Sequence, residues 1–165
     1  MIQVKDVVKS FDGNVVLNHV SASFEDGKVN MIIGQSGSGK TVLMKSMIGL
    51  HQINGGEIVF DTRDGQQNLA AMTEKEVRLL HREVGMLFQG AALFDSMSVQ
   101  ENVMYPLEMF SNMSHDEMVE RARFCLARVN MPERSYSLMP SEISGGMQKR
   151  VAIARAIALN PRYLF

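Results

Sequence analysis

Two spacings of apolar residues alternate along the chain and predict a mixed α/β fold. The runs IQVKDVV at 2–8 and EIVF at 57–60 predict β-strands. The run VNMII at 29–33 is continuous, which predicts a strand buried on both faces. Shortly after it, TVLMKSMIGL at 41–50 carries apolar residues at helical spacing. A loop of glycines and polar residues joins this strand to this helix.

The second half of the chain predicts helices, because signals for helix starts recur there. In each signal a serine or threonine precedes a glutamate by three positions, and the two side chains satisfy N–H groups that the first helical turn leaves unbonded. The pairs are Thr73 with Glu76, Ser98 with Glu101, and Ser114 with Glu117. They predict helices to about residue 81, over about 98–110 and over about 115–129, the last ending before Pro132.

The remaining elements are shorter or close the chain. EVGMLFQ at 83–89 predicts a strand, and GGMQKRVAIARAIAL predicts a helix from Gly145. RYLF at 162–165 begins another apolar run. FDGN at 11–14 and DTRDG at 61–65 predict turns.

Composition narrows the class of protein. The 165 residues suggest one domain, and 45% hydrophobic residues allow a sizeable core. A net charge of −1 gives no basic footprint for nucleic acid over the whole domain. The single cysteine, Cys125, excludes an internal disulfide and fits a cytosolic compartment. The sequence has no run of 18 apolar residues, so it predicts no membrane span. The 14 methionines favour core packing over a surface for a partner.

The loop between the predicted strand and helix matches the phosphate-binding pattern G-x-x-x-x-G-K-[ST] in full. Glycines let backbone N–H groups converge on phosphate oxygens, and the helix that follows offers more N–H groups. Lysine adds a charge toward the β- and γ-phosphates, and threonine offers a hydroxyl to Mg²⁺. The residues are Gly34, Gln35, Ser36, Gly37, Ser38, Gly39, Lys40 and Thr41. They predict a nucleoside triphosphate site, which alone does not choose between kinase, GTPase, motor and transporter ATPase.

A second candidate anion site opens the last predicted helix. The sequence ISGGMQ at 143–148 combines a short hydroxyl with two glycines at a helix N-terminus. Ser and Gly are also common in ordinary helix caps, so this motif is weak evidence when taken alone.

The order of these motifs is more specific than any one of them. A P-loop, then LFQ at a strand end, SGG opening a helix, and ALNPRYLF resemble the nucleotide-binding domain of ATP-binding-cassette (ABC) transporters over nearly the whole chain. The resemblance implies an α/β P-loop NTPase fold with an antiparallel β-subdomain and a helical subdomain. It divides the chain into a nucleotide-binding core and β-subdomain at 1–89, a helical subdomain at 90–143, and a signature helix with the start of the Walker B strand at 144–165.

The resemblance also implies roles for residues outside the P-loop. Gln89 matches the Q-loop glutamine, which contacts Mg²⁺ and the water site and senses the membrane partner. Ser144, Gly145 and Gly146 match the signature motif, which closes on the γ-phosphate held by the other subunit. Phe11 matches an aromatic residue against adenine, although core packing would explain a phenylalanine as well.

In its function this family is an ATP hydrolase with Mg-ATP as its cofactor. Lys40 and Gln89 would be catalytic, and Thr41 and Gln89 would bind the metal. The expected partners are transmembrane permease subunits and a second copy of the chain, with no nucleic acid. The expected location is the cytoplasmic face of the cell membrane.

Two departures from the usual signature, Ile143 for leucine and Met147 for glutamine, narrow the resemblance. Together with GMLFQGAALFDSMSVQENV at 85–103, they are similar to the Mla-type ATPases of bacterial phospholipid transport.

The sequence ends at Phe165, before the family's Walker B aspartate and glutamate, its D-loop and its switch histidine. We therefore expect these 165 residues alone to bind ATP but not to hydrolyse it at a useful rate, and we expect 29–33 to lack strand neighbours. Two alternatives remain open. One is a soluble ABC-type ATPase without a permease, acting in translation or DNA repair, although the usual tandem cassettes or large insertions are not visible. The other is a non-catalytic nucleotide-binding fragment.

Overall fold

The computed structural model describes residues 1–62 and 65–165. The chain divides into two compact units, residues 1–81 and residues 82–165. The turn predicted at 61–65 includes residues 63 and 64, so its centre lies outside the described residues.

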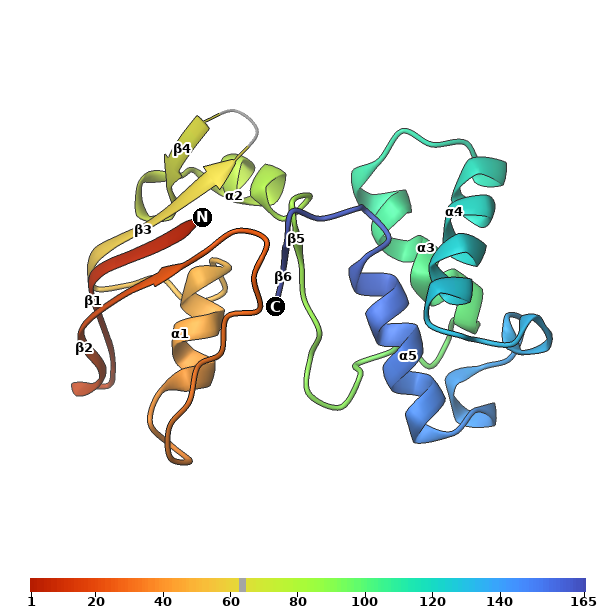
Figure 1. The fold of residues 1–165 in the computed structure, drawn as a ribbon, viewed down its shortest axis with the longest axis horizontal. Helices are drawn as coiled ribbons and strands as arrows, with labels where there is room; N and C mark the ends of the chain where they lie inside the picture. Colours follow the sequence, from red (N-terminus) through yellow and green to blue (C-terminus); the bar gives the residue numbers. More distant parts are fainter. Residues whose placement is uncertain (63–64) are drawn as a thin grey trace. The chain divides into compact units, whose positions relative to one another are not determined.

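Unit 1, residues 1–81, is built on an antiparallel sheet with the strand order β2-β1-β3-β4 (Figure 1). The strands are β1 Ile2–Phe11, β2 Asn14–Phe24, β3 Gly55–Thr62 and β4 Gly65–Asn68. Asp12 and Gly13 join β1 to β2, and both have positive φ, 49° and 83°. Such a pair makes the turn that matches the twist of a hairpin, which confirms the turn predicted at FDGN.

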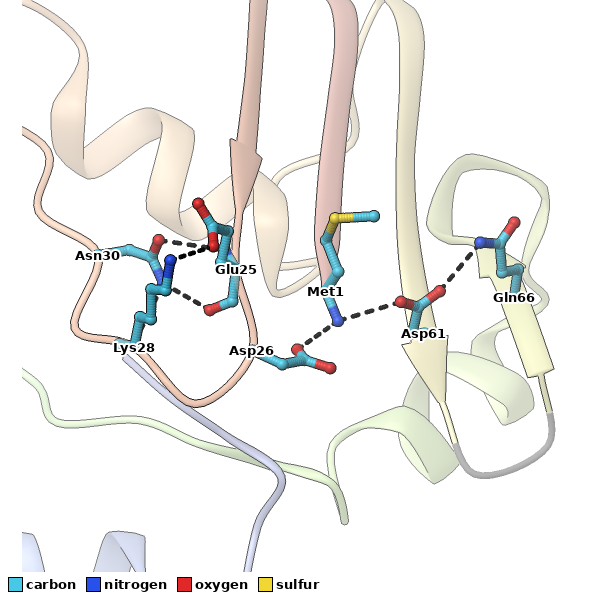
Figure 2. Close-up of polar contacts among 7 residues, drawn as sticks. All are labelled: Met1, Glu25, Asp26, Lys28, Asn30, Asp61 and Gln66. Atoms are coloured by element: carbon cyan, nitrogen blue, oxygen red, sulfur yellow. Dashed lines mark hydrogen bonds and ion pairs between the residues drawn. The ribbon is translucent and has the colours of Figure 1, made fainter.

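Ion pairs and hydrogen bonds tie the end of β2 to the neighbouring strands (Figure 2). The Met1 ammonium group pairs with the carboxylates of Asp26 and, at 3.1 Å, Asp61. Asn30 closes the turn after β2: its Oδ1 accepts from the Glu25 N–H at 3.1 Å, and its Nδ2 donates to the Glu25 carbonyl at 2.9 Å. These contacts fix where the chain leaves the sheet toward the P-loop.

Helices complete unit 1. Helix α1 spans Lys40–Met47 and contacts β2, and its Leu43 and Met47 are buried. The 3₁₀ helix η1 spans Leu69–Ala71, and α2 spans Glu74–Leu80. Thr73 and Glu76 form the capping box at the start of α2, as the sequence predicted.

Unit 2, residues 82–165, is mainly helical (Figure 1). Helices α3 Val99–Phe110, α4 His115–Arg128 and α5 Gly145–Ala156 share one core. The predicted capping boxes at Ser98 and Ser114 are present, and Ser144 caps α5. Two 3₁₀ helices, η2 Glu133–Ser135 and η3 Pro140–Glu142, lead from α4 to α5.

The strands predicted from continuous apolar runs are shorter than expected or missing. β5 Val84–Gly85 pairs in parallel with β6 Tyr163–Leu164, so each strand covers two residues. Residues 29–33 form no strand, and Val29 is 95% exposed. A strand exists only where its backbone finds a partner, and no described residue pairs with this run. The prediction of a strand buried on both faces is therefore wrong for 29–33. The exposed apolar side chains agree with the expectation that this run lacks strand neighbours.

None of the helices in the described ranges combines the length and the apolar character needed to cross a membrane.

Candidate nucleotide-binding site

The P-loop curves between residue 34 and the first turn of α1, and its lysine lies over it. The Lys40 Nζ donates to the carbonyls of Gly34 and Gln35 at 2.8 and 2.5 Å. The Ser38 N–H donates to the Gln35 carbonyl at 3.3 Å, which closes the loop. The ammonium group is thus held on the loop itself, where its positive charge can attract a phosphate.

Gly39 allows the loop to enter helix α1. It has a φ of 86°, in the left-handed region that costs other residues roughly 1–2 kcal/mol. An added Cβ would also lie 3.1 Å from Leu17 Cδ2 and 3.2 Å from the Val16 carbonyl oxygen. Backbone conformation and crowding against β2 both demand glycine here.

The start of α1 suits an anion and its metal. No side chain caps this helix, so N–H groups of its first turn point out of the helix without a capping partner. Thr41 lies in that turn and is exposed. Mg²⁺ bound with nucleotide takes most of its ligands from phosphate oxygens and water, so one hydroxyl fits the residues present. In the part of the chain that the structure describes, no cluster of three His, Cys, Asp or Glu could hold a metal by itself.

Phe11 lies at the hairpin end of β1, also in unit 1. The residue is 37% exposed. His51 meets it in an edge arrangement with the ring centroids 5.3 Å apart, and Lys9 Nζ lies 4.6 Å from its centroid. The ring is therefore a surface group with a cation beside it rather than a member of the sheet core.

A cavity of about 520 Å³ lies in unit 1, but it contains none of the predicted nucleotide-binding residues. Its walls come from the end of α1, from β3 and from α2, and include Ser46, His51 and His81. The P-loop lies at the other end of α1, so this cavity does not mark the phosphate site.

Gln89 lies in unit 2, in an exposed turn after β5. The chain that follows it is unusual, because Gly90, Ala91 and Ala92 all have positive φ. Sequence analysis missed the two polar side chains that hold this segment, Arg155 and Asn102. The signal was available: Arg155 is a charge inside the apolar run VAIARAIAL, where a cation is buried only with partners.

The signature residues begin α5. The Ser144 Oγ accepts from the Met147 N–H at 3.3 Å, which makes it the N-cap. A Cβ on Gly145 would meet nothing within 4 Å, and one on Gly146 would meet only the Ser144 Oγ, at 4.0 Å. Alanine would fit both positions and favour the helix. Packing in this chain therefore does not explain the two glycines.

These features define a P-loop nucleotide-binding protein. The sequence matches the ABC transporter family over residues 17–165, so the chain belongs to that family.

Curated relatives support this assignment. The methionine import ATP-binding protein MetN of Clostridium acetobutylicum is 37% identical over 164 residues, 99% of this chain and 49% of MetN. The glutamine transport ATP-binding protein GlnQ of Escherichia coli is 38% identical over 165 residues, 99% of this chain and 66% of GlnQ. The chloroplastic protein TRIGALACTOSYLDIACYLGLYCEROL 3 of Arabidopsis thaliana is 38% identical over 157 residues, 95% of this chain and 44% of that protein. The chain thus spans about half the length of several relatives.

Solved structures show the same fold. A dimeric post-hydrolysis state of the ATP-binding cassette MJ0796, bound to ADP and Pi, superposes with a TM-score of 0.89 at 31% identity. The match covers 99% of this chain and 72% of that one. The fold is therefore that of an ABC nucleotide-binding domain, with its antiparallel sheet and its helices.

Proposed function

We propose that this chain is the ATP-binding part of an ABC transporter ATPase and that residues 34–41 bind Mg-ATP. The arrangement at the P-loop carries the proposal: Lys40 Nζ lies on the loop carbonyls, and the first turn of α1 has no side-chain cap. Both supply positive charge or N–H donors to one small region, which suits a polyphosphate.

The other predicted residues have roles that follow from family membership. Thr41 binds Mg²⁺ together with the phosphates, and Gln89 orients water and metal. Ser144, Gly145 and Gly146 contact the γ-phosphate bound by a second copy. The open space around both glycines supports close approach by such a partner. Phe11 stacks on adenine, for which its exposed ring is available.

The whole protein would work as a homodimer under permease subunits, at the cytoplasmic face of the membrane, and couple ATP hydrolysis to transport. The dimeric MJ0796 cassette supports the pairing of two copies. That residues 1–165 alone do not hydrolyse ATP at a useful rate remains a prediction.

For the cargo we keep phospholipid as the proposal, on Ile143, Met147 and the segment 85–103. One relative bears the name of a galactosylated diacylglycerol, while MetN and GlnQ are named for methionine and glutamine. ATPase stimulation of the reconstituted transporter by phospholipid, and not by these amino acids, would support the lipid proposal. Stimulation by methionine or glutamine alone would overturn it.

Calorimetric titration of Mg-ATP tests the binding site. Lys40→Ala deletes the charge aimed at the phosphates, and a charged hydrogen bond contributes roughly 1.5–3 kcal/mol. We therefore expect affinity to fall by about tenfold to a hundredfold.

Lys45→Ala is the matched control, because Lys45 lies in the last turn of the same helix. It should leave affinity near that of the wild type. Equal affinities for wild type and Lys40→Ala would contradict the P-loop assignment.

A further inference from the structure

The backbone after Gln89 is held in a conformation that its residues do not prefer. Gly90, Ala91 and Ala92 have φ values of 81°, 65° and 47°. Left-handed backbone costs an alanine roughly 1–2 kcal/mol, so the two alanines need outside support. Such strain persists only where surrounding contacts over-determine it, and it gathers at functional segments.

Arg155, in the last turn of α5, supplies that support. Its Nη1 donates to the Ala92 carbonyl and its Nη2 to the Ala91 carbonyl, both at 2.8 Å. The planar guanidinium fits two successive carbonyls that point the same way, which a lysine ammonium would match only one at a time. Its Cζ also lies 5.7 Å from the centre of the Phe94 ring.

Arg155 is a partly buried cation without a counter-ion among the described residues. Burial lowers the pKa of its guanidinium. In residues 1–62 and 65–165, no carboxylate lies within ion-pair distance of it. Burying a cation without a counter-ion costs free energy unless its N–H groups find acceptors. The two carbonyls of the left-handed segment are those acceptors.

A second anchor fixes the chain further on. Asn102 is fully buried, and its Oδ1 accepts from the Phe94 N–H at 2.8 Å. Its Nδ2 lies 3.0 Å from each of three carbonyls, those of Phe94, Met97 and Ser98. Segment 94–98 is therefore fixed to α3, while Arg155 bonds the carbonyls of residues 91 and 92 to α5.

We propose that Arg155 is a positioning residue for Gln89, acting through the left-handed segment 90–92. The inference rests on the proposed function, in which Gln89 serves the ATP site. Ser144 and Arg155 stand at opposite ends of α5, about 16 Å apart at 1.5 Å per residue. One rigid helix thus carries the predicted phosphate-contacting serine and fixes the segment that leads from Gln89.

The first test is backbone hydrogen exchange on the full-length protein with Arg155→Lys. This substitution keeps the positive charge but removes the guanidinium group that donates to two carbonyls at once. The reporters are the amides of Ala91 and Ala92, which donate to Phe88 and Gly90. We expect their exchange to speed up by about tenfold or more while α4 amides keep their wild-type rates.

Arg121→Lys is the matched control, since Arg121 also donates to two carbonyls, those of Ile157 and Ala158. It should affect residues at the end of α5 and leave 91–92 unchanged. If the amides of residues 91 and 92 exchanged at the wild-type rate in Arg155→Lys, the proposal that Arg155 holds this segment would be overturned.

The second test is steady-state ATP hydrolysis by Arg155→Lys and by the control Arg121→Lys. A catalytic group displaced by about 1 Å can cost a hundredfold in rate, so we expect the kcat of Arg155→Lys to fall by about 10- to 100-fold. The KM for ATP should stay near the wild-type value, because the P-loop residues are unchanged.

Arg155→Lys with Ala91→Gly and Ala92→Gly should recover part of the lost kcat, since glycine adopts positive φ at little cost. An unchanged kcat in Arg155→Lys, with only a lower melting temperature, would mean that the residue is merely structural. If the wild type neither binds nor hydrolyses ATP, the proposed function fails, while the exchange experiment still tests whether Arg155 holds segment 90–92.

Discussion

Gly39 is the residue at which the P-loop depends most directly on the rest of unit 1. It has positive φ at the N-terminus of α1, and a Cβ in place of one of its hydrogens would crowd the Val16 carbonyl and Leu17 of β2. Gly37 has a similar φ of 79°, but a Cβ there would meet nothing within 4 Å. Substitutions at the two glycines therefore distinguish the effect of backbone strain, present at both, from that of crowding, present only at Gly39.

Gly39→Ala should weaken ATP binding and lower stability more than Gly37→Ala does. Both substitutions incur the left-handed penalty of roughly 1–2 kcal/mol. Only Gly39→Ala adds contacts of 3.1 and 3.2 Å with β2, which must shift to relieve them. Melting temperature and calorimetric affinity of the two variants check this, and equal losses in both would show that crowding has no effect.

The P-loop and Arg155 show which parts of the candidate site could be predicted from the sequence. The P-loop was readable because its residues are contiguous and their spacing is fixed by phosphate geometry. Arg155 was readable as a charge inside an apolar run, but its partners were not, because they are carbonyls 63 and 64 positions away. A backbone acceptor carries no side-chain signal, so only the folded chain reveals the pairing.

Among the elements, helices were predicted better than strands for a physical reason. The starts of α2, α3 and α4 rest on Thr73, Ser98 and Ser114, whose capping partners lie three residues away. A strand depends on a neighbour that may be any distance along the sequence. Residues 29–33 have the apolar pattern of a strand without a partner among the described residues.

The capping boxes predict a specific acid sensitivity. The pKa of Glu101 is lowered from 4.5, first by the Ser98 backbone N–H and then by its hydroxyl. The ionised form therefore favours the fold above the unfolded pKa, and this stabilisation is lost as pH falls through the lower folded pKa.

Glu101→Gln keeps an acceptor but does not titrate. We expect any stability advantage of the wild type over Glu101→Gln at pH 7 to shrink at about pH 3.5, in urea unfolding at both pH values. Glu76 and Glu117 titrate in the same direction in both proteins and cancel from the difference. A difference that stays constant with pH would contradict the capping role of the carboxylate.

For the molecule as a whole, the predicted site residues fall into two groups. Phe11 and residues 34–41 belong to unit 1, while Gln89 and residues 144–146 belong to unit 2. In the proposed dimer, the signature residues of one copy serve the nucleotide of the other. Binding by one copy and association of two copies should then respond to different substitutions.

Ser144→Arg in the full-length protein should abolish the ATP-induced dimer and leave ATP affinity within about twofold of the wild type. The reason is that Ser144 is proposed to serve the nucleotide of the other copy, while residues 34–41 bind the nucleotide of its own. The arginine would occupy the open space at the start of α5, which in the proposed dimer receives the γ-phosphate. Ser114→Arg is the matched control, since Ser114 also caps a helix through its Oγ and a backbone N–H. It should lose a similar cap and still dimerise.

Sedimentation with ATP measures dimer formation, and calorimetry measures ATP affinity. Equal loss of ATP affinity and dimer in Ser144→Arg would assign the motif to the chain's own site, and dimer loss in both variants would reduce its role to helix capping.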